Sequence, residues 1–224
     1  MIVRINFLEH NIEVKDDTVF AIECINKSYF YRIITLWNQL AHGVLDENLK
    51  VFEKNEEMNY SSKVEILIDY FNFEFTDKKY QVKLIELLSQ TIEQEDRLKI
   101  ISSLQKIRKL IEKNLIKVDI PIYLQKEIDI ESIFKMLKLS IRTEDTLLEK
   151  LFTMIDIEKN FHFNKLLVFV NLKEYLSKEE LNEFYKYAIY NQISVLMIDN
   201  KTYGTTIDNE HKLIIDENLN EFML

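Results

Sequence analysis

Seven basic residues and a single acidic residue, Glu112, lie between Arg97 and Lys117. This local net charge of +6 stands in a chain of 224 residues whose net charge is −9. On a helical wheel with about 100° per residue, five lysines of this segment fall within about 80° of arc. They are Lys99, Lys106, Lys109, Lys113 and Lys117. The spacing predicts a helix with a lysine face, and such a face favours a polyanion as its partner.

The opposite side of the same predicted helix is apolar. Its residues are Ile100, Leu104, Ile107, Ile111 and Leu115. A solvated helix face is the alternative explanation for the lysines, but such faces usually alternate lysine with acidic residues. Lysine carries a flexible point charge without the fork of arginine, so we expect contact with phosphates and no readout of bases.

Two aspartates occupy positions at which enzymes carry catalytic acids. Asp199 ends the apolar run 195–198, as the magnesium-binding acid does in nucleotide-hydrolysing sheets. Asp69, followed by Asp77-Lys78-Lys79, is the nearest approach to a nuclease pattern, although Asp77 is explained better as a helix cap. The only glycines are Gly43 and Gly204, which excludes a glycine-rich phosphate loop. We therefore expect no enzyme and no bound nucleotide.

Carboxylates gather after the lysine helix, at Asp119, Glu127, Asp129 and Glu131. Carboxylates near an irregular segment are ligands of the kind that calcium takes, and we name Asp119, Glu127 and Asp129 as candidate metal ligands. A solvated acidic loop is the alternative, since no EF-hand spacing is present. The four histidines show no paired spacing and Cys24 is the only cysteine, which excludes a cysteine-based zinc site and an intrachain disulfide.

Apolar periodicity places these residues on elements of a mixed α/β chain. The expected strands are 2–7, 11–15, 18–24, 50–53, 64–70, 165–171, 194–199 and 212–216. The expected helices are 27–42, 77–92, 93–117, 130–139, 145–157 and 177–191, the last of which starts with a capping box. The order strand, helix, strand from 165 to 199 is typical of a βαβ unit with parallel strands.

This order predicts a discontinuous α/β head domain and an all-helical insert, here called the leg. The head domain comprises residues 1–91 and 141–224, and the leg comprises residues 92–140. No apolar run reaches the ~18–20 residues that a membrane-spanning helix requires. The N-terminus alternates apolar and polar residues and lacks the apolar core of a signal peptide, so we expect a cytoplasmic protein.

Several segments resemble the Csn2 family, the spacer-acquisition proteins of type II-A CRISPR systems. The resemblance is carried by residues 164–171 with Tyr175-Leu176, and by 194–199, 213–218, 141–150, 5–9 and 12–14. It is strongest over residues 130–219 and looser over 50–120, while the order of elements agrees along the whole chain. These segments are fold motifs and contain no catalytic motif.

The resemblance implies an α/β head with a mixed sheet that is distantly related to P-loop folds but lacks the phosphate loop. It implies a homotetrameric ring whose positively charged hole binds the ends of double-stranded DNA without sequence preference. It further implies calcium near the leg, no enzymatic activity, and action with the Cas nuclease and the spacer integrase complex during spacer acquisition (adaptation). The family provides no DNA-binding motif that can be transferred, so the lysine assignments rest on this sequence alone.

Two other classes of function remain open. One is an enzyme, either a metal-dependent nuclease or a degenerate ATPase. The other is an interaction module whose lysine face docks acidic protein partners.

Overall fold

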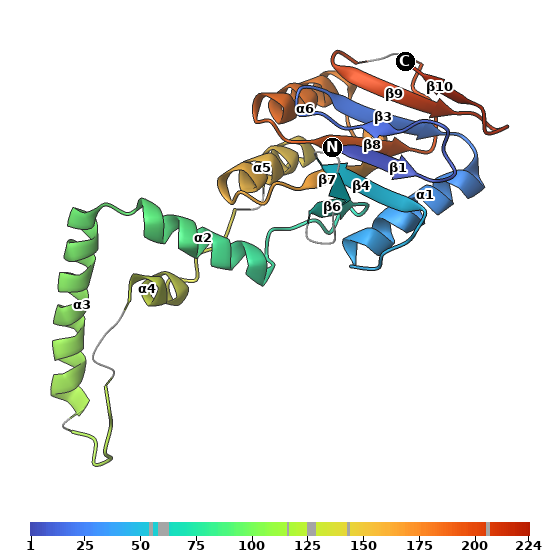
Figure 1. Cartoon of the computed structure of the whole chain (residues 1–224). Coiled ribbons are helices and arrows are strands. Elements are labelled where there is room, and N and C mark those ends of the chain that lie inside the picture. Colours follow the sequence, from blue (N-terminus) through green and yellow to red (C-terminus); the bar gives the residue numbers. More distant parts are fainter. Residues whose placement is uncertain (54–55, 58–62, 116, 125–128, 143, 205–206) are drawn as a thin grey trace. The chain divides into compact units, whose positions relative to one another are not determined.

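The computed structural model describes residues 1–53, 56–57, 63–115, 117–124, 129–142, 144–204 and 207–224. The chain divides into two compact units (Figure 1). Unit 1 combines Met1–Phe73 with Glu144–Leu224, and unit 2 is Glu74–Thr143. Unit 2 is therefore an insertion in the sequence of unit 1.

A six-stranded sheet forms the centre of unit 1, with the order β10-β9-β3-β8-β7-β6. Its strands are β3 (Val19–Cys24), β6 (Val64–Leu67), β7 (Leu166–Val170), β8 (Val195–Asp199), β9 (Glu210–Ile215) and β10 (Glu221–Met223). All neighbouring pairs are parallel except β10 with β9. Every residue of β3, β7 and β8 is buried, which explains why their sequences are nearly continuous apolar runs.

The predicted βαβ unit is present. It runs from β7 through η1 (Leu172–Glu174) and α6 (Lys178–Tyr190) to β8, which pairs in parallel with β7. The capping box that starts α6 is also formed. The Glu180 backbone N–H donates to the Ser177 hydroxyl at 3.2 Å, and the Ser177 N–H donates to the Glu180 carboxylate at 2.8 Å.

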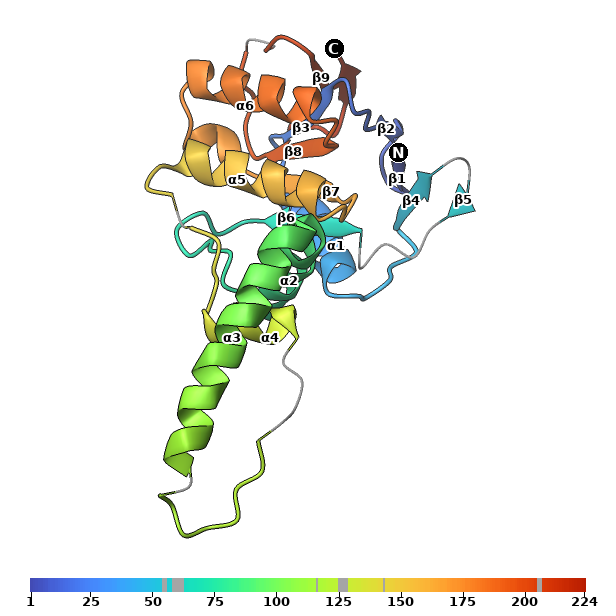
Figure 2. The ribbon, with the colours of Figure 1, turned by 90° about the vertical axis from the view of Figure 1, so that its left-hand side faces the viewer.

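Different layers cover the two faces of the six-stranded sheet (Figures 1 and 2). Helices α5 (Leu147–Asn160) and α6 lie over one face, where the rings of Phe169 and Phe184 meet with centroids 5.3 Å apart. Helix α1 (Lys27–Ala41) packs against the other face, and Gly43 follows it with a φ of 81°, as expected for a residue that ends a helix.

A second, antiparallel sheet lies on the α1 side of the core. Its strands are β1 (Ile2–Ile5), β2 (Ile12–Glu13), β4 (Leu49–Glu53) and β5 (Glu56–Glu57), in the order β2-β1-β4-β5. Alternate residues of β1, such as Val3 and Ile5, are buried with Trp37 of α1 and Leu196 of β8 in a single apolar cluster. This cluster ties the small sheet, the helix and the large sheet together.

Unit 2 contains only helices within its described residues: α2 (Lys78–Thr91), α3 (Gln94–Leu115) and α4 (Ile130–Met136). The unit starts at residue 74, whereas the sequence-based leg starts at residue 92, because α2 packs against α4 instead of joining the sheet. No helix in the described part of the chain is long and apolar enough to cross a membrane.

Replacement of Leu196 by alanine tests whether the shared apolar cluster holds unit 1 together. Leu196 is fully buried on β8, between Phe20 and Val168 on the neighbouring strands. Leu196→Ala leaves a cavity and should lower the free energy of unfolding by about 2–5 kcal/mol. Urea unfolding followed by circular dichroism measures this loss. The control Leu45→Ala, at a side chain that is 64% exposed, should change stability by less than about 0.5 kcal/mol.

Candidate nucleic-acid interface

Helix α3 presents the lysine face that the sequence predicts. It has 22 residues and is therefore about 33 Å long. Glu95 and Asp96 lie in its first turn and Lys113 in its last, which places each charge where it complements the helix dipole. All five lysines of the predicted face are exposed.

Three lysines in the middle of this face have no acidic partner among the described residues. Lys106, Lys109 and Lys113 form no ion pair with any residue that the structure describes. They lie within seven residues of one another, so their backbone positions span about 10 Å of helix. We call these three residues the free lysine face.

The two outer lysines differ from this central group. The Lys99 ammonium forms ion pairs with Glu95 at 2.8 Å and Asp96 at 3.2 Å, and these hydrogen bonds raise the pKa of Lys99. Lys117 lies beyond the end of α3 and donates to the side chain of Asn114 at 3.2 Å. The predicted helix 93–117 is therefore shorter in the structure, where α3 is Gln94–Leu115. The lysine face is neutralised at its N-terminal end by the ion pairs of Lys99.

The apolar side of α3 is only partly covered. Ile107 and Ile111 are 52% and 45% exposed, and no residue of α3 is buried. Arg108 lies on this side, where its guanidinium donates to Glu112 at 2.8 Å and to the backbone oxygen of Leu124 at 3.5 Å. The second bond ties the returning segment 117–124 to α3, beside which it runs in Figure 2.

The two units carry opposite net charge. Residues 74–143 include 14 lysines and arginines against 11 aspartates and glutamates, a net charge of +3. Since the whole chain carries −9, unit 1 carries −12. A polyanion is therefore attracted to unit 2 and repelled by unit 1.

The candidate calcium ligands are not assembled into a site within the described residues. Asp119 is exposed after α3, and Glu127 lies outside the described residues. Asp129 caps α4 by accepting a hydrogen bond from the Ser132 N–H at 2.6 Å, and this bond lowers the pKa of Asp129. No group of three or more potential metal ligands is found in the part of the chain that the structure describes.

The aspartates considered as catalytic acids have other surroundings in the structure. Asp69 accepts hydrogen bonds from the backbone N–H groups of Phe71 and Asn72, which form a tight turn after β6. Asp77 lies at the N-cap position of α2 as expected, but its side chain makes no capping hydrogen bond. Asp199 is fully buried, with the Lys173 ammonium 3.8 Å from one carboxylate oxygen. The nearest cation to Asp199 is therefore the side chain of a buried lysine.

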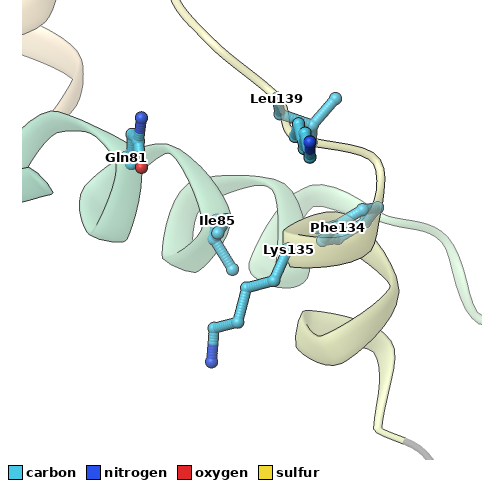
Figure 3. Close-up of a pocket in the computed structure, with 6 residues that line it drawn as sticks. Gln81, Ile85, Phe134, Lys135 and Leu139 are labelled. Atoms are coloured by element: carbon cyan, nitrogen blue, oxygen red, sulfur yellow. The ribbon is translucent and has the colours of Figure 1, made fainter. Parts of the chain in front are cut away.

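Unit 2 also contains a pocket of about 270 Å³ between α2 and α4 (Figure 3). It is lined by Gln81, Ile85, Phe134, Lys135, Lys138 and Leu139. In Figure 3 the Gln81 amide and the Lys135 ammonium point in opposite directions. These two polar groups thus do not converge on one point, as the polar groups of most ligand sites do.

Comparison with known proteins identifies the family. The family model for CRISPR-associated protein Csn2 (Cas_Csn2) matches residues 44–219. A CRISPR-associated protein Csn2 of Enterococcus faecalis is 25% identical over 228 residues, which cover 96% of each chain. A CRISPR-associated protein Csn2 of Streptococcus agalactiae is 24% identical over 209 residues, covering 88% of this chain and 89% of that protein.

A solved structure has a similar fold. The crystal structure of Stu0660 of Streptococcus thermophilus matches 96% of this chain and 75% of its own chain, with a TM-score of 0.58 and 12% identity. The family model covers well over half of the chain, and both relatives match nearly along their full length. The resemblance found in the sequence is thus confirmed, and the chain belongs to the Csn2 family of CRISPR-associated proteins.

Proposed function

We propose that this protein binds the ends of double-stranded DNA without sequence preference, as a homotetrameric ring, during CRISPR spacer acquisition. The observation that carries this proposal is the free lysine face of Lys106, Lys109 and Lys113 on a positively charged unit. Membership of the Csn2 family supports a role in adaptation. The relatives' names carry no enzymatic activity, in keeping with a protein that binds DNA without cleaving it.

The chemistry of the free lysine face fits a duplex backbone. Double-stranded DNA carries one negative charge per about 1.7 Å of its axis, so a row of ammonium groups about 10 Å long meets several phosphates. Lysine neutralises phosphates without reading base edges, and binding then depends on charge and on salt. Three lysines per chain make a weak site, and the symmetric repetition of a ring multiplies the interactions with DNA.

Other elements of the proposal follow from the family. The proposed partners are the Cas nuclease and the spacer integrase complex, and the proposed location is the cytoplasm. Calcium is the proposed metal, with Asp119, Glu127 and Asp129 as ligands. The structure describes Asp119 and Asp129, whereas Glu127 lies outside the described residues, so calcium remains a proposal that rests on the family resemblance.

Charge reversal of the free lysine face tests the DNA-binding role. Lys106→Glu with Lys113→Glu should abolish duplex binding at physiological salt, because two attractive charges become repulsive. Binding of a fluorescent linear duplex, measured by anisotropy over a series of salt concentrations, gives both affinity and salt dependence. Circular dichroism should be unchanged, since both side chains are exposed and form no described ion pair.

Lys99 provides the matched control on the same helix. Lys106→Ala should reduce the slope of log K against log salt by about 0.9 for each phosphate that the binding unit no longer neutralises. Lys99→Ala should reduce this slope less, because Glu95 and Asp96 already neutralise its ammonium. Equal reductions in the two variants would show that the local ion pairs do not shape the interface.

Binding to DNA ends predicts a preference for linear over closed circular duplex. A ring loads onto a free end but cannot thread a closed circle, so the linear form of one plasmid should bind far more tightly. Gel-shift and size measurements with both forms check this, and equal affinity contradicts threading. The same samples with magnesium and ATP should show intact DNA and no phosphate release, whereas cleavage or hydrolysis would favour the enzymatic class.

Two substitutions at Asp129 separate helix capping from calcium binding. Asp129→Ala removes the N-cap of α4 and should lower stability by about 1 kcal/mol, whereas Asp129→Asn retains a capping oxygen and should be nearly neutral. Thermal unfolding with calcium and with a chelator then tests the metal. If Asp129 binds calcium, calcium raises the wild-type melting temperature and Asp129→Asn abolishes that rise. A calcium effect that persists in Asp129→Asn places the ion elsewhere.

A further inference from the structure

Five charged side chains are buried together between the large sheet and α6, and we call them the buried charge cluster. They are Glu23 of β3, Lys173 of η1, Asp199 at the end of β8, and Glu210 and Lys212 of β9. None is more than 7% exposed. Charged residues are rarely buried unless each is paired and hydrogen-bonded, so the partners of each group decide its protonation state.

Four members of the cluster have close partners. The Lys173 ammonium lies 2.6 Å from Glu210 and 3.0 Å from Glu23. The Lys212 ammonium lies 2.7 Å from Glu23 and 3.5 Å from Glu210. Glu210 also accepts a hydrogen bond from the Tyr185 hydroxyl at 2.9 Å, and Glu23 accepts one from the backbone N–H of Tyr203 at 3.1 Å. The two glutamates are thus well stabilised as anions.

Asp199 is the exception in the cluster. It is fully buried, and neither of its carboxylate oxygens has a hydrogen-bond partner among the described residues. Its nearest cation, the Lys173 ammonium at 3.8 Å, is already shared by both glutamates. The Lys173 backbone N–H favours the anion but lies outside hydrogen-bonding geometry.

The charges of the cluster do not balance when every group is ionised. Three carboxylates face two ammonium groups, which leaves one negative charge without compensation in a buried environment. Such a charge is costly, and a buried acid avoids that cost by keeping its proton. A proton on Asp199 makes the cluster neutral and leaves every described ion pair of the glutamates intact.

We propose that the buried charge cluster is a proton-binding site, in which Asp199 of the folded protein keeps its proton at mildly acidic pH, where an exposed aspartate is ionised. Loss of this proton introduces a third anion that competes with Glu23 and Glu210 for Lys173. Since Glu23 also holds the backbone of Tyr203, ionisation of Asp199 weakens the attachment of the segment after β8 to the sheet. The site requires neither DNA nor a second chain and is independent of the proposed function.

The ionisable groups around Asp199, which come from several helices and strands, favour this assignment. Burial raises the pKa of Asp199 to about 7; Lys173 opposes this shift, and Glu23 and Glu210 add to it. In contrast, hydrogen bonds from Lys212 and the charge of Lys173 outweigh burial and lower the pKa of Glu23. The groups that face or couple to Asp199 are Glu23, Lys173, Glu210, Lys212, Tyr70, Tyr185 and Tyr203. The pKa of each of these tyrosines is raised, so all three stay neutral.

The sign of the resulting pH dependence follows from proton linkage. The folded state holds the Asp199 proton up to about pH 7, whereas the unfolded chain releases it near the ordinary aspartate pKa of 3.8. Between these values the folded state binds more protons, so stability falls as pH rises, and it levels off above pH 7. The unfolding equilibrium constant attributable to Asp199 then rises up to about tenfold per pH unit between pH 5 and 7.

Asp199→Asn tests the site, because asparagine retains the shape of the neutral acid and cannot ionise. Urea unfolding of the full-length protein at pH 5, 6, 7 and 8 gives the unfolding equilibrium constant of each variant. The ratio of the wild-type constant to the Asp199→Asn constant should rise at least tenfold from pH 5 to pH 7. Because both variants share all other titrating groups, this ratio isolates Asp199. A ratio that is constant with pH overturns the proposal.

Asp69→Asn is the matched control, since Asp69 lies just after β6 of the same sheet but is exposed, and its hydrogen bonds with Asn72 lower its pKa. Its ratio to wild type should stay constant between pH 5 and 7. Should Asp199→Asn fail to fold, the wild-type carboxyl carbon resonances supply the test. In the wild type, one aspartate resonance should titrate near pH 7. The proposal is supported if this titration is absent from Lys173→Met or shifted to higher pH in that variant. No aspartate titrating above pH 5 overturns it.

Discussion

Burial of the parallel sheet on both faces is the constraint on which the rest of this molecule depends. Strand β3 comes from residues 19–24, and its neighbours β8 and β9 come from residues 195–215. Their pairing brings the N-terminal and C-terminal parts of the chain together in unit 1. Parallel strands need cover on both sides, and α1 with the small sheet supplies one layer while α5 and α6 supply the other. Unit 2 is inserted between residues 73 and 144. This insertion does not interrupt the pairing of β3 with β8 and β9, because unit 2 lies between β6 and α5 in the chain.

The buried sheet also explains why charged residues are arranged differently in the two units. A sheet buried on both faces leaves most charged residues of unit 1 at its outer surface, where acidic residues dominate. The exceptions are the buried charge cluster and Glu158 of α5. Unit 2 has little core of its own, and its long helix α3 has no buried residue. A helix with this exposure is free to present one whole face of lysines. At physiological salt such charges act over about 8 Å, so the DNA contact that we propose depends on the local face rather than on the net charge of the chain.

The regular parts of this fold follow from the sequence because their signals are local. The apolar runs of β7 and β8 and the capping box of α6 each lie within a few residues, and each was predicted correctly. The short strands β5 and β10 were not predicted, since pairing with a neighbour, and not their composition, makes them strands. The start of unit 2 differs from that of the sequence-based leg for a similar reason: the packing of α2 against α4 joins segments about 50 residues apart.

The candidate site shows the same division between local and distant information. The lysine face could be predicted from the sequence because the fixed rotation per residue of a helix places residues at this spacing on one side. The neutralisation of Lys99 was missed, although Glu95 and Asp96 lie just outside the basic segment, within one turn of the helix. The partners of Asp199 had no such local signal, since residues 23, 173 and 210 come together only through the sheet. The sequence feature that pointed to them was the presence of charged residues within buried strands, namely Glu23, Asp199, Glu210 and Lys212. A charge in a strand that is otherwise apolar therefore identifies a member of a buried network, while its partners must be found in the folded sheet.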